Sequence, residues 1–178
     1  MKIFINPGHA PNGEPDPGAC GNNLRESDVA SDVASSVALY LEAVGHETMY
    51  FQCNSLRDIC SKSNEWSADL FISIHCNSAE NTEARGAETF YCAGSESGEK
   101  LADCIQKQLV DIGMTDRGIK DNSLYVTRNT DAPAVLVELG FISNADDALL
   151  FSSVLGRDNF ARAVARGITD YIGGKQGG

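Results

Sequence analysis

The alternation of short apolar runs with segments of helical periodicity constrains this chain more than any other feature. Six apolar runs have the length of β-strands, and they cover residues 2–6, 48–51, 70–74, 87–91, 124–126 and 134–137. Between most of them, apolar residues recur at every third or fourth position. Because strands that alternate with helices pair in parallel through helical crossovers, the pattern predicts an α/β domain with a largely parallel sheet.

The clearest helix is predicted over residues 28–44. Its apolar residues share one face, Ser27 is available as an N-terminal cap, and Gly45 follows as a stop. Further helices are predicted over 55–66, where Ser55 and Asp58 resemble a capping box, over 99–112 and over 158–172. We expect one domain over residues 1–173, and a flexible tail or linker start over the glycine-rich residues 174–178.

Charge excludes one class of partner. The 178 residues carry 14 Lys and Arg against 25 Asp and Glu, for a net charge of −11. Binding to the phosphate backbone needs a basic surface, so we expect no nucleic acid partner. No apolar run is long enough to cross a membrane, and no apolar leader opens the chain, so we expect no membrane insertion.

The six cysteines indicate neither a thiolate metal site nor a disulfide framework. They are widely spaced and contain no CxxC pair. We expect most of them to be reduced and to act as small buried apolar residues.

Three of the apolar runs lead into ionisable residues, and these are the candidates for chemistry. The runs that begin at residues 2, 70 and 134 reach His9, His75 and Glu138. Ligands of open α/β folds bind at the carboxyl ends of parallel strands, so these side chains can converge there. Glu26, just before the clearest predicted helix, can face the same edge.

Two imidazoles and one carboxylate are a ligand set of catalytic zinc, which keeps a fourth position for water. A second carboxylate is then available as a general base. This combination predicts metal-assisted hydrolysis, although the spacing has none of the compactness of an HExxH helix.

Several motifs along the chain resemble, in order, those of the zinc-dependent N-acetylmuramoyl-L-alanine amidases of type 3. They are Ile3 and Asn6-Pro7-Gly8-His9, Asp16-Pro17-Gly18-Ala19, Glu26, Ser73-Ile74-His75-Cys76-Asn77, and the stretch from Pro133 to Asn144 with Val137-Glu138-Leu139-Gly140-Phe141 at its centre. The likeness covers nearly the whole chain, and the last motif is the most specific.

The resemblance implies one zinc ion bound by His9, Glu26 and His75, with Glu138 as the catalytic carboxylate. It implies a single domain with a twisted, mostly parallel six-stranded sheet flanked by helices, similar to the phosphorylase/hydrolase fold. The implied reaction cleaves the amide bond between N-acetylmuramic acid and L-alanine in peptidoglycan or muropeptides. We therefore expect a role in degrading the cell wall, as in an endolysin or an autolysin.

The resemblance also sets expectations for where the chain acts. The place of action is the wall, outside the cytoplasm. Without a leader in this chain, we expect phage-type release or a catalytic domain excised from an exported protein. A wall-binding module belongs to a longer chain or is absent, and we expect a monomer.

The chain departs from the family pattern in its first loop. Asn6 stands where the family usually has Asp, and Ala10-Pro11 follows the first His in place of glycines. Neither change removes a ligand. Some members carry an autoinhibitory helix after the second His, but only about ten residues separate His75 from Gly86 here, which predicts an open groove without such a helix.

Other polar residues near these motifs have weaker claims. Metal-bound histidines usually donate the N–H of their second ring nitrogen to a carboxylate or another acceptor. Of the two acidic residues in the first loop, Glu14 and Asp16, Asp16 is the better candidate to orient a ligand imidazole in this way. Asn77 and Arg85 could contact substrate from the loop after His75. We expect His46, after a helix end, to be structural.

Two other functions stay open at this point. A zinc carboxypeptidase or amidohydrolase acting on free peptides uses the same groups. Such an enzyme would also need an arginine to bind the terminal carboxylate of its substrate, and Arg117 and Arg128 are available for this. A non-catalytic wall-binding module with the same fold would not need all four groups.

Overall fold

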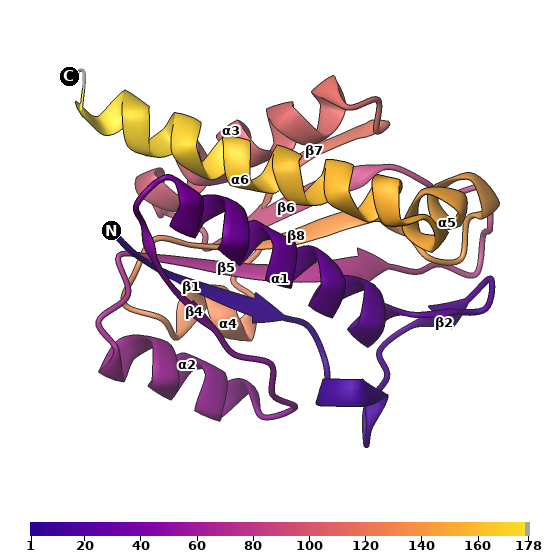
Figure 1. Cartoon of the computed structure of the whole chain (residues 1–178), viewed down its shortest axis with the longest axis horizontal. Coiled ribbons are helices and arrows are strands. Elements are labelled where there is room, and N and C mark those ends of the chain that lie inside the picture. Colours follow the sequence, from indigo (N-terminus) through magenta and orange to yellow (C-terminus); the bar gives the residue numbers. More distant parts are fainter. Residues whose placement is uncertain (177–178) are drawn as a thin grey trace.

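The computed structural model describes residues 1–176 as three layers, with helices on both faces of a six-stranded sheet (Figure 1). The strand order is β4-β1-β5-β8-β6-β7, and only the pairing of β6 with β8 is antiparallel. The strands are β1 (Lys2–Pro7), β4 (Glu47–Tyr50), β5 (Leu70–Asn77), β6 (Ala87–Tyr91), β7 (Asp116–Asp121) and β8 (Ala134–Phe141). This architecture confirms the predicted fold class.

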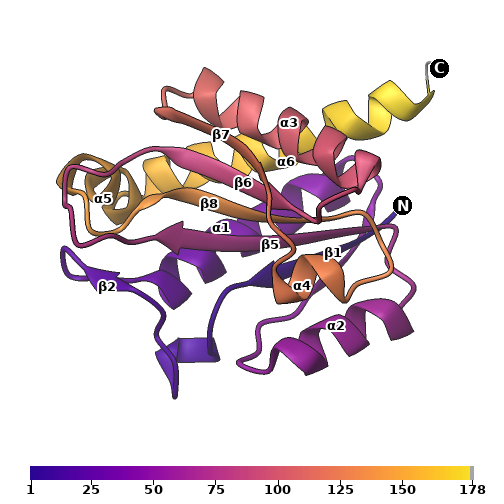
Figure 2. The ribbon, with the colours of Figure 1, turned by 180° about the vertical axis from the view of Figure 1, so that it is seen from behind.

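The helices cover the two faces unequally. One face is covered by α1 (Glu26–Ala43), α3 (Glu96–Asp111) and α6 (Val154–Gln176), with α5 (Ala145–Ser152) beside them. On the other face lie only α2 (Leu56–Glu65) and the single turn α4 (Tyr125–Arg128), and Figure 2 shows β6 and β7 without a helix in front of them. We call this second face the open face. The first loop holds η1 (Pro11–Gly13) and a small hairpin of β2 (Cys20–Gly21) and β3 (Leu24–Arg25).

Alternation along β5 assigns its side chains to the two faces. Ile72 and Ile74 are fully buried in the larger core under α1 and α6, whereas Phe71 belongs to the smaller core of the open face. There Phe71 stacks on Phe4 with ring centroids 5.5 Å apart. Because successive side chains of a strand point to opposite faces, Ser73 and His75 share the open face with Phe71.

One predicted strand was wrong and one strand was missed. Residues 124–126 do not pair in the sheet, because Leu124 caps the turn α4 that begins at Tyr125. The sixth strand is instead β7, whose sequence Asp-Arg-Gly-Ile-Lys-Asp has one apolar residue. An edge strand has one unpaired side, where charged residues are favoured, so it lacks the apolar pattern of the inner strands.

Helix boundaries also differ from the prediction. The clearest helix, α1, begins at Glu26 after Arg25, so the prediction of Ser27 as its cap was wrong, and Ser27 is buried in the first turn. The last helix continues to Gln176, past its predicted end at residue 172, and residues 177 and 178 of the predicted tail lie outside the described residues. Ser55 caps α2 as predicted, with its side chain accepting from the Asp58 amide at 3.2 Å.

Two further expectations can be compared with the structure. All six cysteines are free, but only Cys60 and Cys76 are buried, so the expectation that most of them act as buried apolar residues was wrong. In the described part of the chain, every helix is too short or too polar to cross a membrane.

Candidate metal centre and active site

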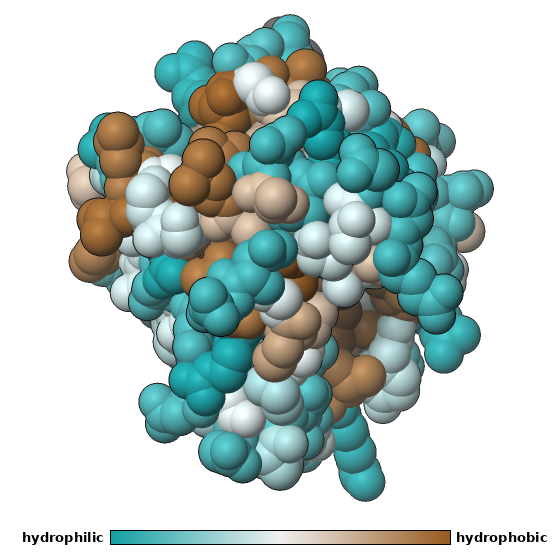
Figure 3. Space-filling model, turned by 90° about the vertical axis from the view of Figure 1, so that its right-hand side faces the viewer, coloured by the Kyte–Doolittle hydropathy of each residue, from teal (hydrophilic) through white to brown (hydrophobic). Residues whose placement is uncertain are grey.

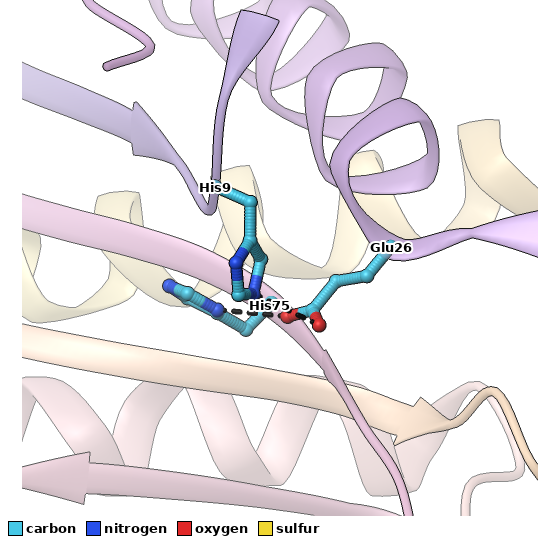
Figure 4. A group of neighbouring side chains, drawn as sticks. All are labelled: His9, Glu26 and His75. Carbon is cyan, nitrogen blue, oxygen red and sulfur yellow. Dashed lines mark hydrogen bonds and ion pairs between the residues drawn. The ribbon is translucent and has the colours of Figure 1, made fainter. Parts of the chain in front are cut away.

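His9, Glu26 and His75 converge at the carboxyl end of the sheet, and Figure 4 shows both imidazoles turned toward the carboxylate. His9 lies in the loop after β1, Glu26 is the first residue of α1, and His75 lies on β5. His9 Nε2 is 2.9 Å from Glu26 Oε2, and His75 Nδ1 is 2.8 Å from Glu26 Oε1. Three residues that are far apart in sequence thus form one cluster.

Two glycines allow this close approach. A Cβ atom on Gly8 would lie 2.3 Å from the His75 ring, and one on Gly18 would lie 2.4 Å from the His9 ring and 2.6 Å from Glu26 Oε2. Gly18 also has a φ of +69°, which glycine adopts without strain. His9 itself has a φ of 64°, an uncommon backbone conformation that aims its side chain at Glu26. The glycine positions in these motifs therefore serve the packing of the cluster.

The outward nitrogen of His9 has a carboxylate partner. His9 Nδ1 donates to Asp16 Oδ2 at 2.8 Å, and the second oxygen of Asp16 accepts from the Gly18 amide at 3.0 Å. This bond orients the ring and directs Nε2 at Glu26. Asp16 thus occupies the orienting position expected for it.

His75 is oriented by a chain of two polar side chains. Its Nε2 lies 3.2 Å from Ser73 Oγ, which donates to Asn6 Oδ1 at 2.8 Å. The Asn6 amide in turn donates to two backbone carbonyls at 3.0 Å. When His75 Nε2–H donates to Ser73, the lone pair of Nδ1 is directed into the cluster. The departure of Asn6 from the usual Asp is therefore compatible with an oriented ligand.

The carboxylate of Glu26 is held in its charged form. Burial acts to raise the pKa of Glu26, but hydrogen bonds from His75 and His9 outweigh burial and hold this pKa well below its ordinary value. The same hydrogen bond from His9 to Glu26 raises the pKa of His9 to about 9, against the opposing effect of burial. Without a metal ion, His9 is therefore protonated near neutral pH, and its Nε2–H occupies the position from which Nε2 could bind a cation.

The donor set fits a zinc ion. One nitrogen of each imidazole and one Glu26 oxygen all lie within 4.8 Å of one another, and each nitrogen is 2.8–2.9 Å from a Glu26 oxygen. Bonds of about 2.0–2.2 Å to a single ion hold its ligand atoms no more than roughly 4.4 Å apart, so a small adjustment of these side chains would bring all three donors onto one ion. The other nitrogen of each ring has a polar partner, as ligand histidines generally do. His9, Glu26 and His75 are therefore a candidate metal centre.

Glu138 lies beside this centre on the neighbouring strand. Its Cα is paired with that of His75 in the register of β5 and β8, so both side chains project from the open face. Burial raises the pKa of Glu138 to about 7, although His75 acts to lower it. Its Oε2 atom is buried and makes no hydrogen bond within the described residues, and no ion pair to arginine is present there. Glu138 as a residue is only half-buried, so its carboxyl group is partly accessible to solvent.

A largely apolar recess of about 400 Å³ adjoins the histidines on the side of α2 and α4. His9, Asp16 and His75 form its polar wall, and its apolar walls include Leu56, Ile59, Leu124, Val126 and Leu136. Figure 3 looks onto the end of the molecule to which β1 and β5 point, where hydrophilic residues surround a hollow with hydrophobic side chains in its walls. The loop over residues 78–86 contains no helix that could cover this region, as predicted.

Three other predicted residues lie outside the cluster. Asn77 donates to Glu88 Oε1 at 2.5 Å, and Arg85 forms an exposed ion pair with Asp146 at 2.7 Å. The substrate contacts expected for Asn77 and Arg85 stay predictions. His46 follows the end of α1, where its backbone amide donates to the Leu41 carbonyl at 3.1 Å, and its structural role stays a prediction.

Sequence reasoning missed a charged group next to Glu138. Glu88 on β6 is paired with Glu138 in the strand register, and its side chain lies within 3.3 Å of Arg117 and 3.4 Å of Lys120, both on β7. A carboxylate inside the apolar run of residues 87–91 was a signal for this group. The cations were not found because β7 was not predicted.

The fold and the cluster together define the class of an α/β protein with a candidate His-Glu-His metal centre at the carboxyl edge of its sheet. A family model described as N-acetylmuramoyl-L-alanine amidase matches residues 3–170. This chain therefore belongs to the N-acetylmuramoyl-L-alanine amidase family.

Individual relatives agree with this assignment. The chain is 37% identical over 176 residues to the N-acetylmuramoyl-L-alanine amidase LytC of Bacillus subtilis, and 34% identical over 182 residues to the endolysin of Bacillus phage SPP1. These matches cover 95% and 96% of this chain but only 35% of LytC and 64% of the endolysin, so both relatives contain further sequence.

Solved structures give the same result for the fold. The amidase AmiC2 of Nostoc punctiforme superposes with a TM-score of 0.90 at 29% identity, over 97% of both chains. An amidase of Clostridium difficile gives a TM-score of 0.87 at 30% identity, over 98% of this chain and 97% of that one.

Proposed function

We propose that this chain hydrolyses the amide bond between N-acetylmuramic acid and L-alanine in peptidoglycan, using one zinc ion held by His9, Glu26 and His75. The observation that carries the proposal is the convergence of these three ligands beside Glu138 in a member of this amidase family. Residues 1–173 would form the catalytic unit.

Zinc, when bound, supplies a Lewis acid that polarises a carbonyl oxygen and lowers the pKa of water. The protein supplies the rest of the chemistry. His9 and His75 are oriented by Asp16 and Ser73, so their lone pairs point at one place. The ring of His75 also forms part of the recess that the substrate would enter.

Glu138 is the general base and then the general acid of the proposed reaction. Its carboxylate accepts a proton from the attacking water and delivers it to the nitrogen of the departing L-alanine. A carboxyl whose pKa lies near 7 is suited to both transfers, since it gains and loses a proton at similar free energy near neutral pH.

The same groups serve a carboxypeptidase that acts on free peptides. That reaction needs a cation close to the scissile bond to bind the terminal carboxylate. Arg117 lies on β7, which β6 separates from β8, so it is not adjacent to the His-Glu-His cluster. Arg128, the last residue of α4, is not among the residues that line the recess beside the histidines. A non-catalytic wall-binding module would not need a Glu138 carboxylate with one buried oxygen that has no hydrogen-bond partner in the described residues.

Partners and place of action follow from the substrate. The proposed substrate is peptidoglycan or its muropeptides, and the protein would act at the cell wall. With a net charge of −11, the domain would be repelled by anionic wall polymers, so retention on the wall would depend on the groove or on a separate module.

The test is to digest purified wall with the zinc-loaded protein and to identify the new amino termini. Release of L-alanine amino termini, abolished by a chelator and restored by zinc, is the expected result. Glu138→Gln is the matched inactive control. Release of carboxyl-terminal amino acids would support the carboxypeptidase instead, and no released product would support the binding module.

A further inference from the structure

Arg117 and Lys120 form a cationic group on the open face, two strands away from the proposed catalytic carboxylate. Glu88 Oε2 accepts from Arg117 Nε at 3.3 Å and lies 3.4 Å from Lys120 Nζ. Its other oxygen, Oε1, accepts from Asn77 at 2.5 Å. Two cations therefore share one carboxylate oxygen, and the group carries an excess positive charge.

This group is open to a ligand. The side chains of Arg117 and Lys120 are 36% and 41% exposed, whereas Glu88 is only 6% exposed. The Arg117 guanidinium lies over the Phe141 ring, 4.7 Å from its centroid, which fixes its plane. Its two terminal nitrogens make no hydrogen bond within residues 1–176, so a fork of donors remains for a planar acceptor.

The strand register connects the cations to the reaction centre. His75, Glu138 and Glu88 are successive partners across β5, β8 and β6. Arg117 lies in the irregular part of β7, where Ala87 pairs with Asp116 and Thr89 with Ile119, so it is opposite Glu88. With neighbouring strands roughly 4.8 Å apart, Arg117 lies two strands, or roughly 10 Å, from Glu138.

An excess of positive charge is an exception in this region of the molecule. The whole chain has a net charge of −11, and the reaction centre itself contributes Glu26, Glu138 and Asp16. A cation pair held in place by a buried carboxylate in such surroundings is suited to an anionic group of the substrate. Exposed guanidinium and ammonium groups bind carboxylates through charge-assisted hydrogen bonds.

The chemistry of the proposed substrate identifies that group. The lactyl carboxyl of muramic acid is consumed in the scissile amide, so the muramoyl side of the bond has no free carboxylate there. The stem peptide on the other side does carry free carboxylates. A chain spans at most about 3.3–3.6 Å per residue, so a carboxylate two or three residues beyond the amide can reach a site roughly 10 Å away.

We propose that Arg117 and Lys120 bind a free carboxylate of the stem peptide and thereby select substrates in which it is not amidated. This inference rests on the proposed amidase function and extends it to the peptide side of the bond. The apolar recess on the α2 side of His75 then lies on the muramoyl side.

The experiment uses two synthetic muramoyl peptides that differ only at the second stem residue, which carries either an α-carboxylate or a carboxamide. The readout is the ratio of their kcat/KM values for the zinc-loaded protein. We expect the wild type to prefer the carboxylate by about tenfold or more, the scale of a charge-assisted pair. Arg117→Gln and Lys120→Met should each lower this ratio toward one.

The ratio separates binding from folding, because a variant that is only partly folded loses rate on both substrates equally. Arg166→Gln is the matched control, since it removes one cation from α6 on the opposite face, where Arg166 pairs with Asp170. It should keep the wild-type ratio. Equal rates on the two substrates in the wild type, or an unchanged ratio in both Arg117→Gln and Lys120→Met, would overturn the inference. Cleavage of neither substrate would instead remove the proposed amidase function, and the inference with it.

Discussion

Glu138 is paired with His75 across the parallel strands β8 and β5, and one of its carboxylate oxygens is buried without a hydrogen-bond partner. A buried carboxylate without a partner destabilises a fold. Its position one strand away from the candidate metal centre gives that destabilisation a functional reason, because a reacting water would provide the missing partner.

Glu138→Gln should separate metal binding from turnover. The amide cannot accept a proton, so we expect the rate to fall by about 10²–10⁴-fold while one zinc ion per chain is retained. His75→Ala should lose both zinc and turnover. Zinc content and hydrolysis rate, measured on the same samples, test both variants. His46→Ala is the control substitution, which should change neither quantity. Full activity of Glu138→Gln would contradict the assigned base.

The same substitution should stabilise the metal-free protein in a pH-dependent way. The pKa of Glu138 is raised from 4.5 to about 7, so its destabilising effect is absent below pH 4.5, grows between 4.5 and 7, and is complete above 7. A shift of this size corresponds to about 3 kcal/mol as an upper value. Denaturant unfolding at pH 4.5 and 8 should show that Glu138→Gln has a higher free energy of unfolding than the wild type only at pH 8. Equal effects at both values would contradict the shift.

Ser73→Ala should weaken zinc binding without removing a ligand. The hydroxyl connects His75 Nε2 to Asn6, and loss of such an orienting partner typically lowers metal affinity by about 10–100-fold. Ser63→Ala is a matched control, because Ser63 is also fully buried and its hydroxyl makes no hydrogen bond in the described structure. Competition with a chelator measures both affinities. Equal affinities would show that the polar chain does not orient His75.

The metal-free protein should lose stability as the pH rises. The pKa of His9 is raised from 6.5 to about 9, chiefly by its hydrogen bond to Glu26, so this stabilisation is complete below pH 6.5 and is lost as the pH passes 9. We expect a loss on the order of 2 kcal/mol in the free energy of unfolding between pH 6 and 9.5. His9→Gln should abolish most of it, and His46→Gln should not. A pH-independent unfolding free energy would contradict the ion pair.

How far the site could be predicted depended on where each residue lies. His9 follows the inner strand β1, and His75 and Glu138 lie in the carboxyl-terminal halves of the inner strands β5 and β8. Because the carboxyl ends of parallel strands converge, their proximity could be predicted. Glu26 was placed before its helix, but it begins α1, since Arg25 rather than Ser27 precedes the first turn. The ligand role of Glu26 depended on family resemblance.

The part that could not be predicted lies on the sheet edge. Arg117 and Lys120 belong to β7, a strand held by backbone pairing to β6 and not by an apolar face. Its residues carry no periodic signal, so their place beside Glu88 emerges only from the folded register. Likewise, the apolar residues 124–126 favoured a strand, although tertiary packing makes them the start of α4.

The most direct test of the account is a crystal structure of the zinc-loaded protein with anomalous data collected at the zinc edge. The account predicts one anomalous peak, bounded by His9 Nε2, Glu26 and His75 Nδ1, with Glu138 adjacent but not a ligand. The peak should vanish in His75→Ala crystals. A peak elsewhere, a peak with Glu138 as a ligand, or no peak in zinc-loaded crystals would contradict the assigned centre.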